Sequence, residues 1–357
     1  MLVTVVSSDV SDNALNRALV LGELLARNFD VQLIGSRFGR DVWEPARLEC
    51  GGSASALEVV PGRWFPMYAA SMAQLLRRIR GDVVYAVKPL LSSFGVALLT
   101  RKPVILDIDD DELAFRPRGH WHYSVGHPMG RTWTRLALAQ RSRAAAVTVA
   151  TSALQQRYGG TIVPHARDTE RIRPMPEARD AARATLGVGE RAVVMFLGTP
   201  RPHKGLDDAV AAVRMMRREA VLVVIGSESG GDASALHRAA VPLERLPFVL
   251  SAADVVVVPQ RATAAGMVQL PAKLLDAMAA ARPVVATAVA DNAAILADGR
   301  GVIVPPSDPP ALARALDAIL DDPAAAAAMG ERARAWCKKN ASVETLASVV
   351  AEVVRSV

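Results

Sequence analysis

The chain has 357 residues, of which 51% are hydrophobic and only 4% aromatic, and its formal net charge is +6. This length and apolar content suffice for two ordinary hydrophobic cores, so we expect two domains. The 42 basic and 36 acidic residues are spread along the chain. No basic stripe with interleaved aromatic residues occurs, which argues against a nucleic-acid partner and leaves anionic small molecules or an anionic membrane surface.

The cysteines and the amino terminus bear on the compartment. Cys50 and Cys337 lie far apart, so the sequence predicts neither a disulfide framework nor a zinc site. The opening MLVTVVSSDV lacks a signal peptide's basic region and cleavage site, and no apolar run reaches about 18 residues without a charge. We therefore expect a cytoplasmic protein, peripheral at most to the inner face of the plasma membrane. The abundance of alanine and arginine is typical of a GC-rich bacterial sequence.

In the first half of the chain, short apolar runs alternate with helical patterns. The predicted strands span residues 2–6, 31–34, 83–87, 104–108 and 146–149. The predicted helices between them span 13–27 and 67–79. This alternation is typical of βαβ units and a parallel sheet.

A second series of the same kind follows a stretch rich in proline and charge. Its predicted strands are 192–197, 221–225, 254–258, 283–287 and 301–304, and its helices are 205–218, 270–281 and 309–321, with one or two more in 323–356. The sequence thus predicts an α/β protein with two doubly wound parallel-sheet domains, which bind ligands at the carboxyl edges of their strands. The predicted boundaries are a first domain 1–168, a linker 169–190, a second domain 191–335 and a terminal helix 336–357 that packs back on the first domain.

The segment FLGTPRPHKGLDD, residues 196–208, follows a strand and opens a helix. Gly198 and Gly205 permit a sharp turn and a close backbone approach, and Arg201 and Lys204 bring two cations to it. Backbone N–H groups, a helix N-terminus and fixed positive charge together suit a diphosphate. The alternative is a solvated basic loop whose aspartates cap the helix.

The segment LPAKLLDAMAAARPVVAT, residues 270–287, places Lys273 and Asp276 on one face of a helix. It follows a flexible turn, RATAAGMVQ, at the carboxyl edge of the preceding strand. A lysine near phosphate and a carboxylate that accepts from ribose hydroxyls would explain the pair. The alternative is a simple helix ion pair worth about 0.3 kcal/mol.

Together, GTPRPHKG, SAADVVVVPQ and LPAKLLDAMAAARPVVAT resemble the donor domain of GT-B nucleotide-sugar glycosyltransferases, specifically the large retaining family four, also called glycosyl transferases group 1. VTVATSALQQRYGG and VPHARDTERIRP resemble the end of that family's first domain and its linker. The resemblance covers nearly the whole chain. It implies a GT-B fold with two Rossmann-like domains around a central cleft.

The resemblance also implies a set of donor-binding residues. The family's glycine turn and lysine fall on Gly198, Lys204 and Gly205, and Arg201 replaces the arginine that many members place where Thr199 stands here. The acid that binds the ribose falls on Asp276, near Lys273. The acid that usually contacts the donor sugar falls on Val268, a departure that leaves the backbone of Gly266, Met267 and Val268, or the side chain of Gln269, to replace it.

The first domain offers further candidates. SSDVSDNALNRALVLGELL resembles the family's first strand, loop and helix, with Asp12 and Asn13 in place of the usual glycines. Asn13, Asn16 and Arg17 are candidates for the acceptor side of the cleft. The alternative for Asp12 or Asn13 is a helix cap.

Candidate catalytic residues lie in two later stretches. Asp109 belongs to the acidic run LDIDDDE, which either binds a metal or ends a strand, with the remaining acids facing solvent. His120 and His122 lie in the loop RPRGHWHYSVGHP, and the family often uses a first-domain histidine near the donor sugar. The resemblance implies no metal and no cofactor.

The resemblance therefore implies a retaining glycosyltransferase that moves a sugar from a nucleotide sugar of the UDP or GDP type to a hydroxyl acceptor on a glycan, a glycolipid or a small metabolite. The basic helical patterns at 75–82 and 131–143 favour an acceptor in a lipid-linked or envelope glycan. The alternative is an inactive sugar-nucleotide binder or scaffold of the same fold, which the departure at Val268 keeps open. A nucleotide-sugar dehydrogenase or epimerase is disfavoured, because no G-x-G-x-x-G follows either first strand.

Overall fold

The structure is a computed structural model, and it describes residues 1–43, 57–63, 67–114, 130–227 and 235–357. The chain forms two compact units. The first comprises Met1–Ala166 together with Val343–Val357, and the second comprises Arg167–Ser342.

The first unit contains a parallel sheet of seven strands. They are β1 (Leu2–Ser7), β2 (Asp30–Arg37), β3 (Glu58–Pro61), β4 (Val83–Val87), β5 (Val104–Ile108), β6 (Ala146–Val149) and β7 (Thr161–Ile162), in the order β3-β2-β1-β4-β5-β6-β7. The order reverses between β1 and β4, where Val3 pairs with Val83 on one side and with Val31 on the other. Such a reversal is the point at which doubly wound sheets bind ligands, at the carboxyl edge.

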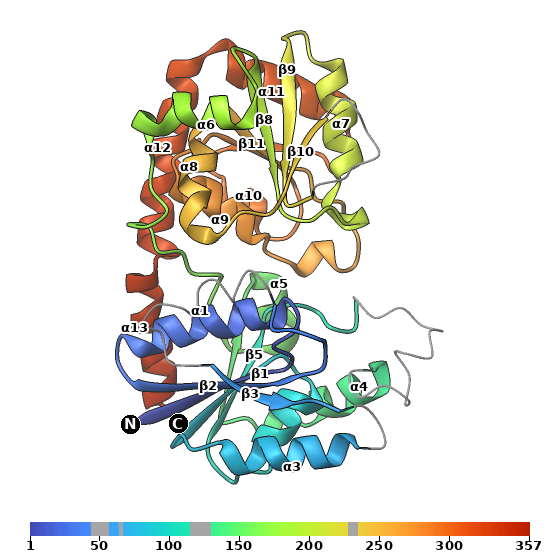
Figure 1. The fold of residues 1–357 in the computed structure, drawn as a ribbon, viewed down its shortest axis with the longest axis vertical. Coiled ribbons are helices and arrows are strands. Elements are labelled where there is room, and N and C mark those ends of the chain that lie inside the picture. The colour runs from blue at the N-terminus through green and yellow to red at the C-terminus, as the bar shows by residue number, and fades with distance from the viewer. Residues whose placement is uncertain (44–56, 64–66, 115–129, 228–234) are drawn as a thin grey trace. The chain divides into compact units, whose positions relative to one another are not determined.

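Helices cover both faces of this sheet (Figure 1). They are α1 (Ala14–Ala26), α3 (Tyr68–Arg78), the short π-helix η1 (Leu91–Gly95), α4 (Arg131–Ala139), α5 (Ser152–Tyr158) and α13 (Val343–Arg355). The last of these packs against α1, because Leu346 and Val350 share one buried cluster with Leu21 and Leu25. Helix α13 therefore completes the hydrophobic core that β1 and α1 form at the other end of the sequence.

The second unit repeats the architecture with six parallel strands. They are β8 (Ala192–Leu197), β9 (Ala220–Ile225), β10 (Ala235–Arg238), β11 (Val255–Val258), β12 (Val284–Thr287) and β13 (Val302–Val304), in the order β10-β9-β8-β11-β12-β13. The reversal here lies between β8 and β11. Val193 and Met195 pack into one buried cluster and Val194 into another, so the strand is buried on both faces.

Two groups of helices form these clusters. The cluster with Val193 includes α6 (Arg179–Leu186), α8 (Leu246–Ser251), α9 (Ala272–Ala279) and α12 (Pro323–Asn340), and the other includes α7 (Leu206–Met215) and α11 (Pro309–Asp321). The short helix α10 (Asn292–Ile295) follows β12. Four short turns complete the unit: η4 (Pro176–Ala178), η5 (Pro202–Lys204), η6 (Leu243–Arg245) and η7 (Gly266–Val268).

The compact units differ from the predicted boundaries at two places. The predicted linker 169–190 contains α6, which belongs to the second unit because Ala182 and Leu186 are buried in its core. The predicted terminal helix 336–357 is interrupted: its first residues end α12 in the second unit, and α13 begins afresh in the first. Among the described residues, no helix is both long enough and apolar enough to cross a bilayer.

Candidate active site

The loop between β8 and α7 is a tight turn built on two glycines. Gly198 has a φ of +90° and Gly205 a φ of +69°, a region that favours glycine. A Cβ on Gly205 would lie 1.9 Å from the carbonyl oxygen of Pro259, so the loop after β11 approaches too closely for any side chain there. The turn lies at the carboxyl edge of the sheet, where the strand order reverses between β8 and β11.

Two lysines converge on this turn. The Nζ of Lys204 donates to the carbonyl oxygen of Thr199 at 2.9 Å. Lys273, from α9, is 9% exposed, and its Nζ lies 3.9 Å from the centre of the Phe196 ring. Within the described residues, the Nζ of Lys273 has no hydrogen-bond acceptor. The glycine turn therefore carries buried positive charge with little to offset it.

The pKa values of these lysines reflect that imbalance. Burial, and then repulsion from Arg201, lowers the pKa of Lys204 to about 8. Burial, and then repulsion from Lys204, lowers the pKa of Lys273 well below its ordinary value. A diphosphate at the turn would supply the missing negative charge, because an opposite charge nearby favours the protonated form of a lysine.

A half-buried acid near the turn, Asp208, is already paired with an arginine. Arg261, after β11, donates from Nη2 to Oδ1 and from Nε to Oδ2 of Asp208, at 2.8 and 2.9 Å. Its backbone N–H also donates to the carbonyl oxygen of His203 at 2.8 Å. Arg261 thus links the loop after β11 to the glycine turn. Because Asp208 is paired with Arg261, it does not compete with an anionic ligand for the lysines of the turn.

The segment 266–269 follows β11 and is held by hydrogen bonds to its backbone. The backbone N–H of Gly266 donates to Oγ1 of Thr263 at 3.0 Å, and Nε2 of Gln260 donates to the carbonyl oxygen of Gly266 at 2.8 Å. Met267 is 45% exposed, while Val268 and Gln269 are half-buried. An apolar side chain thus stands at 268, where the resemblance to the glycosyltransferase family leads one to expect an acid.

Helix α9 carries Lys273 and Asp276 one turn apart, as predicted. Asp276 does not pair with Lys273, however. Its Oδ1 accepts from Nε of Arg167, at the start of the second unit, and both side chains are largely buried. The interpretation of residues 273 and 276 as a simple helix ion pair is therefore wrong.

In the first unit, Asp109 lies just beyond β5 in a dense group of charges. The Nζ of Lys88 lies 3.1 Å from an oxygen of Asp109, 3.4 Å from Asp110 and 2.6 Å from Glu112. Burial alone would raise the pKa of Asp109, but the positive charges of Lys88 and then Arg17 outweigh it and hold the pKa below its ordinary value. Asp109 is thus an ionised, buried carboxylate.

The other acids of this run are also engaged. Arg157 pairs with Asp111, which is 4% exposed, so the expectation that this acid faces solvent is wrong. Among the described residues, no group of three or more histidine, cysteine, aspartate or glutamate side chains is arranged to hold a metal ion. The arginine and lysine partners occupy the carboxylates that a cation would use.

Arg17 is not on an accessible surface, which corrects its assignment to the acceptor side. It is 1% exposed, and its guanidinium forks onto both oxygens of Asp107 at 2.8 and 2.9 Å. It also donates to the carbonyl oxygens of Val163 and Pro164. Arg17 therefore ties α1 to β5 and to the end of the first unit.

The remaining candidates of the first domain lie at the start of α1 or outside the described residues. Asn13 is exposed and Asn16 is half-buried at the start of α1. Asp12 accepts from the backbone N–H of Ala14 at 2.7 Å, while Asn13 makes no side-chain cap bond. His120 and His122 lie outside the described residues.

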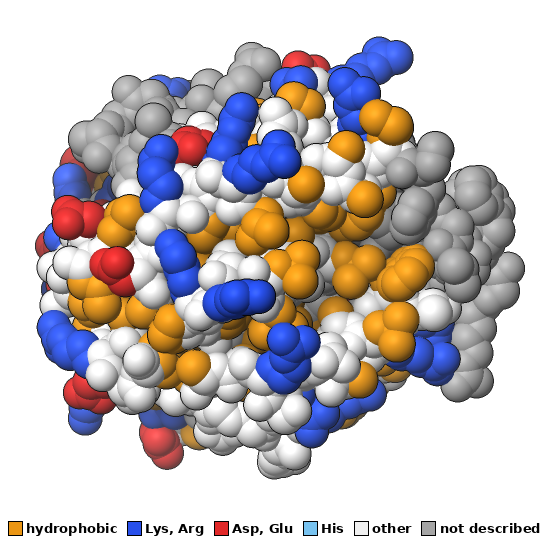
Figure 2. Space-filling view, turned by 90° about the horizontal axis from the view of Figure 1, so that it is seen from below, with side chains coloured by type: hydrophobic (Ala, Val, Ile, Leu, Met, Phe, Trp, Pro, Cys, Tyr) orange, Lys and Arg blue, Asp and Glu red, His pale blue; other side chains and the backbone are white. Residues whose placement is uncertain are grey.

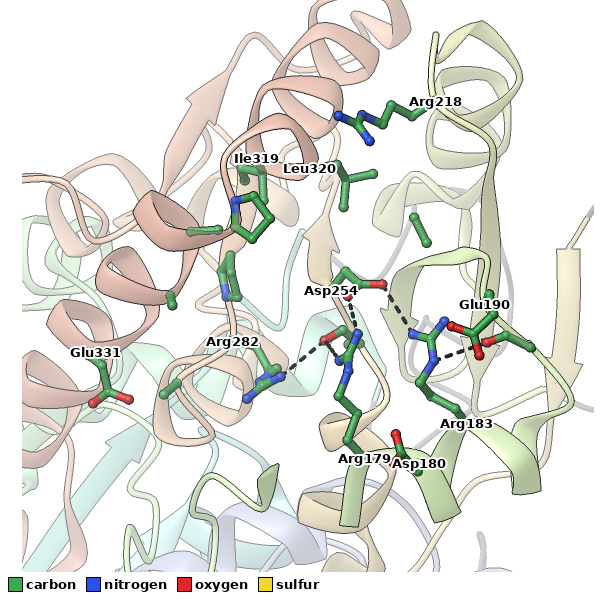
Figure 3. Close-up of a pocket in the computed structure, with 18 of the residues that line it drawn as sticks. Arg179, Asp180, Arg183, Glu190, Arg218, Asp254, Arg282, Ile319, Leu320 and Glu331 are labelled. Carbon is green, nitrogen blue, oxygen red and sulfur yellow. Dashed lines mark hydrogen bonds and ion pairs between the residues drawn. The ribbon is translucent and has the colours of Figure 1, made fainter. Parts of the chain in front are cut away.

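A pocket of about 790 Å³ lies at the opposite, amino-terminal edge of the second sheet (Figure 3). Its arginines are occupied by the protein itself. Arg179 and Arg282 each donate to the carbonyl oxygen of Ala253 at 3.3 Å, and both Arg179 and Arg183 pair with Asp254. These side chains brace the turn between α8 and β11, and this role accounts for them without a ligand.

Two features of the sites were missed from the sequence. Lys88, in YAVKP, directly follows a buried strand, and a charged residue at that position is a sequence signal for a functional or ion-paired site. Arg167, in VPHARD, lies at the end of the predicted first domain 1–168, and nothing in the sequence marked it as a partner of Asp276.

Residues 191–322 match the model of a family described as Glycosyl transferases group 1. The GDP-mannose-dependent alpha-(1-6)-phosphatidylinositol monomannoside mannosyltransferase of Mycolicibacterium smegmatis is 30% identical over 261 residues, covering 64% of this chain and 68% of that one. The D-inositol 3-phosphate glycosyltransferase of Kineococcus radiotolerans is 35% identical over 206 residues, covering 48% of this chain and 46% of that one.

Solved structures agree in fold. Anabaena Alr3699/HepE, solved in complex with UDP-glucose, superposes with a TM-score of 0.81 at 17% identity and covers all of both chains. WaaG, a glycosyltransferase involved in lipopolysaccharide biosynthesis, gives 0.68 at 17% identity, covering 99% of each chain. The predicted GT-B fold with two Rossmann-like domains is confirmed. The chain belongs to the glycosyl transferases group 1 family and is a glycosyltransferase.

Proposed function

We propose that this enzyme transfers a sugar, with retention of configuration, from a nucleoside diphosphate sugar bound by its second unit to a hydroxyl acceptor. One observation carries the proposal. At the glycine turn, the buried Lys273 has no acceptor among the described residues and lies near the half-buried Lys204, and the pKa values of both are lowered. Buried unpaired cations are costly to keep in a folded protein, and an anionic ligand offsets that cost.

In the proposed reaction, the bond between the anomeric carbon and the diphosphate oxygen breaks, and the acceptor oxygen bonds to that carbon on the same face. The acceptor proton passes to the leaving phosphate oxygen. Lys204, Lys273 and the exposed Arg201 stabilise the negative charge that collects on the leaving diphosphate. No step of the proposed reaction uses a metal or a cofactor.

The rest of the donor is assigned to α9 and the segment before it. Asp276 accepts hydrogen bonds from the ribose hydroxyls. The side chain of Gln269 contacts the sugar in place of an acid at Val268, because the backbone N–H groups of residues 266–269 all donate to acceptors within the protein, which argues against their predicted role. An inactive nucleotide-sugar binder remains the second candidate, since the apolar side chain at 268 is the observation that favours it.

The names of the relatives indicate which donor nucleotides and which acceptors to favour. One relative is named for GDP-mannose and phosphatidylinositol monomannoside, another for D-inositol 3-phosphate, and a structural neighbour was solved with UDP-glucose. We therefore favour GDP or UDP as the nucleotide. For the acceptor we favour a hydroxyl of a glycolipid or envelope glycan over that of a natural product.

The first unit is assigned to the acceptor. Asp109 is held ionised by Lys88, so it suits accepting hydrogen bonds from acceptor hydroxyls and does not suit donating a proton. Asn13 and Asn16 remain candidates at the same carboxyl edge, and His120 and His122 remain candidate catalytic residues.

A basic face of the first unit suits contact with an anionic membrane at the cytoplasmic side. In Figure 2, Lys and Arg side chains lie among apolar ones. Leu99 and Leu136 are 64% and 51% exposed. Exposed arginines on α3, α4 and the loop after η1 are Arg77, Arg78, Arg101 and Arg135. Cosedimentation with phosphatidylcholine vesicles, with and without phosphatidylserine, tests this contact. Equal binding to both would contradict it.

A thermal-shift screen tests the donor assignment. UDP, GDP, dTDP, ADP and CMP are added first, followed by the matching sugar nucleotides. A ligand at about 100 times its Kd adds about 2.7 kcal/mol of stability. We expect GDP or UDP to stabilise the protein strongly, and its sugar nucleotide to be consumed when acceptor is added. Stabilisation without hydrolysis or transfer would favour the inactive binder, and stabilisation by none would contradict the proposed donor site.

A further inference from the structure

Arg167 lies where the chain enters the second unit, and Ser342 lies where the chain leaves it. The two residues form a parallel β-bridge, and the N–H of Arg167 donates to the carbonyl oxygen of Ala341 at 2.8 Å. The two crossings of the chain between the units are therefore joined to each other by main-chain pairing.

The side chain of Arg167 connects these crossings to α9. Its Nε donates to Oδ1 of Asp276, and the side chains of the two residues are 10% and 13% exposed. A pair this well buried depends on both members, because removing one leaves the other as an uncompensated charge. The same helix carries Lys273, one turn before Asp276.

A second arginine holds the same helix to the same segment. From α12, Arg334 donates to the carbonyl oxygen of Ile172 at 3.1 Å and to that of Thr169 at 2.8 Å. It also donates to the carbonyl oxygen of Ala279, at the end of α9. Segment 167–172 thus contacts α9 at two points, directly through the Arg167 side chain at Asp276 and, by way of Arg334, at the carbonyl oxygen of Ala279.

We propose that Arg167 is a positioning residue that fixes the Asp276 carboxylate for the bound nucleotide. Through this contact, nucleotide binding would also reduce the mobility of the two chain crossings at Arg167 and Ser342. The inference rests on the proposed function, which assigns Asp276 to the donor ribose. Since binding free energies are linked reciprocally, a nucleotide that restricts the motion of Asp276 also restricts the motion of Arg167 and of the bridge to Ser342.

A double-mutant cycle on the full chain tests the coupling. The dissociation constants of GDP and UDP are measured by calorimetry for the wild type, Arg167→Met, Asp276→Asn and the double variant. We expect each single change to weaken binding on the order of tenfold, and the double variant to bind no more weakly than either single one. Arg167→Lys, which keeps the charge, should recover part of the loss, and it replaces Arg167→Met in the cycle if that variant does not fold.

Hydrogen exchange supplies a readout that a purely structural role would not move. In the wild type, nucleotide should slow exchange of the amides in 167–172 and 341–343, and Arg167→Met should abolish this slowing. Arg171→Gln is the matched control, because Arg171 lies in the same segment but pairs with Glu244 at the surface. It should leave affinity and exchange unchanged.

The outcomes separate the two proposals. Wild-type affinity in Arg167→Met, additive losses in the cycle, or nucleotide-dependent slowing that survives the substitution would each overturn the role of Arg167 alone. If neither GDP nor UDP binds the wild type, the proposed function itself fails.

Discussion

The carboxyl edges of the two sheets have the same topology and opposite electrostatics. Each carries a lysine next to the reversal of strand order: Lys88 after β4 and Lys204 after β8. Lys88 is surrounded by three carboxylates, whereas Lys204 has another lysine, Lys273, as its neighbour. A lysine at a strand end therefore does not by itself mark an anion site. What marks one is a buried cation that the protein leaves uncompensated.

The largest effect is expected at the compensated lysine. Lys88→Met leaves Asp109 and Glu112 buried without their cation, so we expect a loss of about 3–5 kcal/mol in the free energy of unfolding. Urea unfolding measures it, with the exposed Lys339→Met as the control. A loss below about 1 kcal/mol would mean that the carboxylates do not depend on Lys88, and the contrast between the edges would fail.

The second change should act in the opposite direction on stability. Lys273→Met replaces an uncompensated buried ammonium, whose pKa is lowered by burial, with an apolar side chain of similar size. We expect the unliganded protein to gain on the order of 1 kcal/mol, which raises Tm by about 2–4 °C for a domain of this size. Diphosphate affinity should fall about 100-fold, as for loss of one partner of a buried charge pair. Differential scanning calorimetry and nucleotide titration measure the two effects. A variant that is less stable yet binds normally would reverse the assignment.

Protein stability should depend on pH through Lys204. Because its pKa is lowered to about 8 in the folded, unliganded protein, the protonated form is disfavoured there relative to the unfolded chain. Stability contributed by this group should therefore rise as pH increases from about 8 to about 10.5, its unfolded value.

Nucleotide binding should show the opposite trend, because the diphosphate needs the protonated lysine. Affinity should be strongest below pH 8 and should fall above it, with proton uptake on binding near pH 8. Titration calorimetry in two buffers of different ionisation enthalpy measures that uptake. An affinity that is flat between pH 7 and pH 9, with no proton uptake, would contradict the role of Lys204.

The smallest effect is expected at the exposed Arg201. Its charge lowers the pKa of Lys204, so Arg201→Gln should move that pKa upward. Loss of an exposed charge should weaken diphosphate binding only a few-fold, by about 0.5–1 kcal/mol, and less at high salt. Nucleotide titrations at low and high salt measure this. A loss as large as that of Lys273→Met would mean that Arg201 is a main contact of the phosphate.

Much of the fold was predictable because buried parallel strands are continuous apolar runs. The runs at 104–108 and 192–197 coincide with β5 and β8. Edge strands such as β3 and β10 were missed, since each has four residues and carries no long apolar run. Helix α6 was placed in a linker because only Ala182 and Leu186 of its eight residues are buried, which leaves the segment mostly polar.

Local sites were predictable and long-range partners were not. The glycine turn and its lysine form one short segment, so spacing alone indicated Gly198, Lys204 and Gly205 as a unit. By contrast, the partner of Asp276 is Arg167, 109 residues away in sequence, and the partner of Arg17 is Asp107, 90 residues away. Pairings of this kind depend on how the elements pack, so the spacing of residues in the sequence does not predict them.

The most direct test of the account is a calorimetric titration of GDP and UDP into the wild type and Lys204→Ala, with Lys339→Ala as the matched control. We predict that at least one diphosphate binds the wild type and Lys339→Ala equally, and that Lys204→Ala abolishes the binding. Equal binding to all three proteins, or none to the wild type, would contradict the claim that the uncompensated lysines at this edge form the donor site.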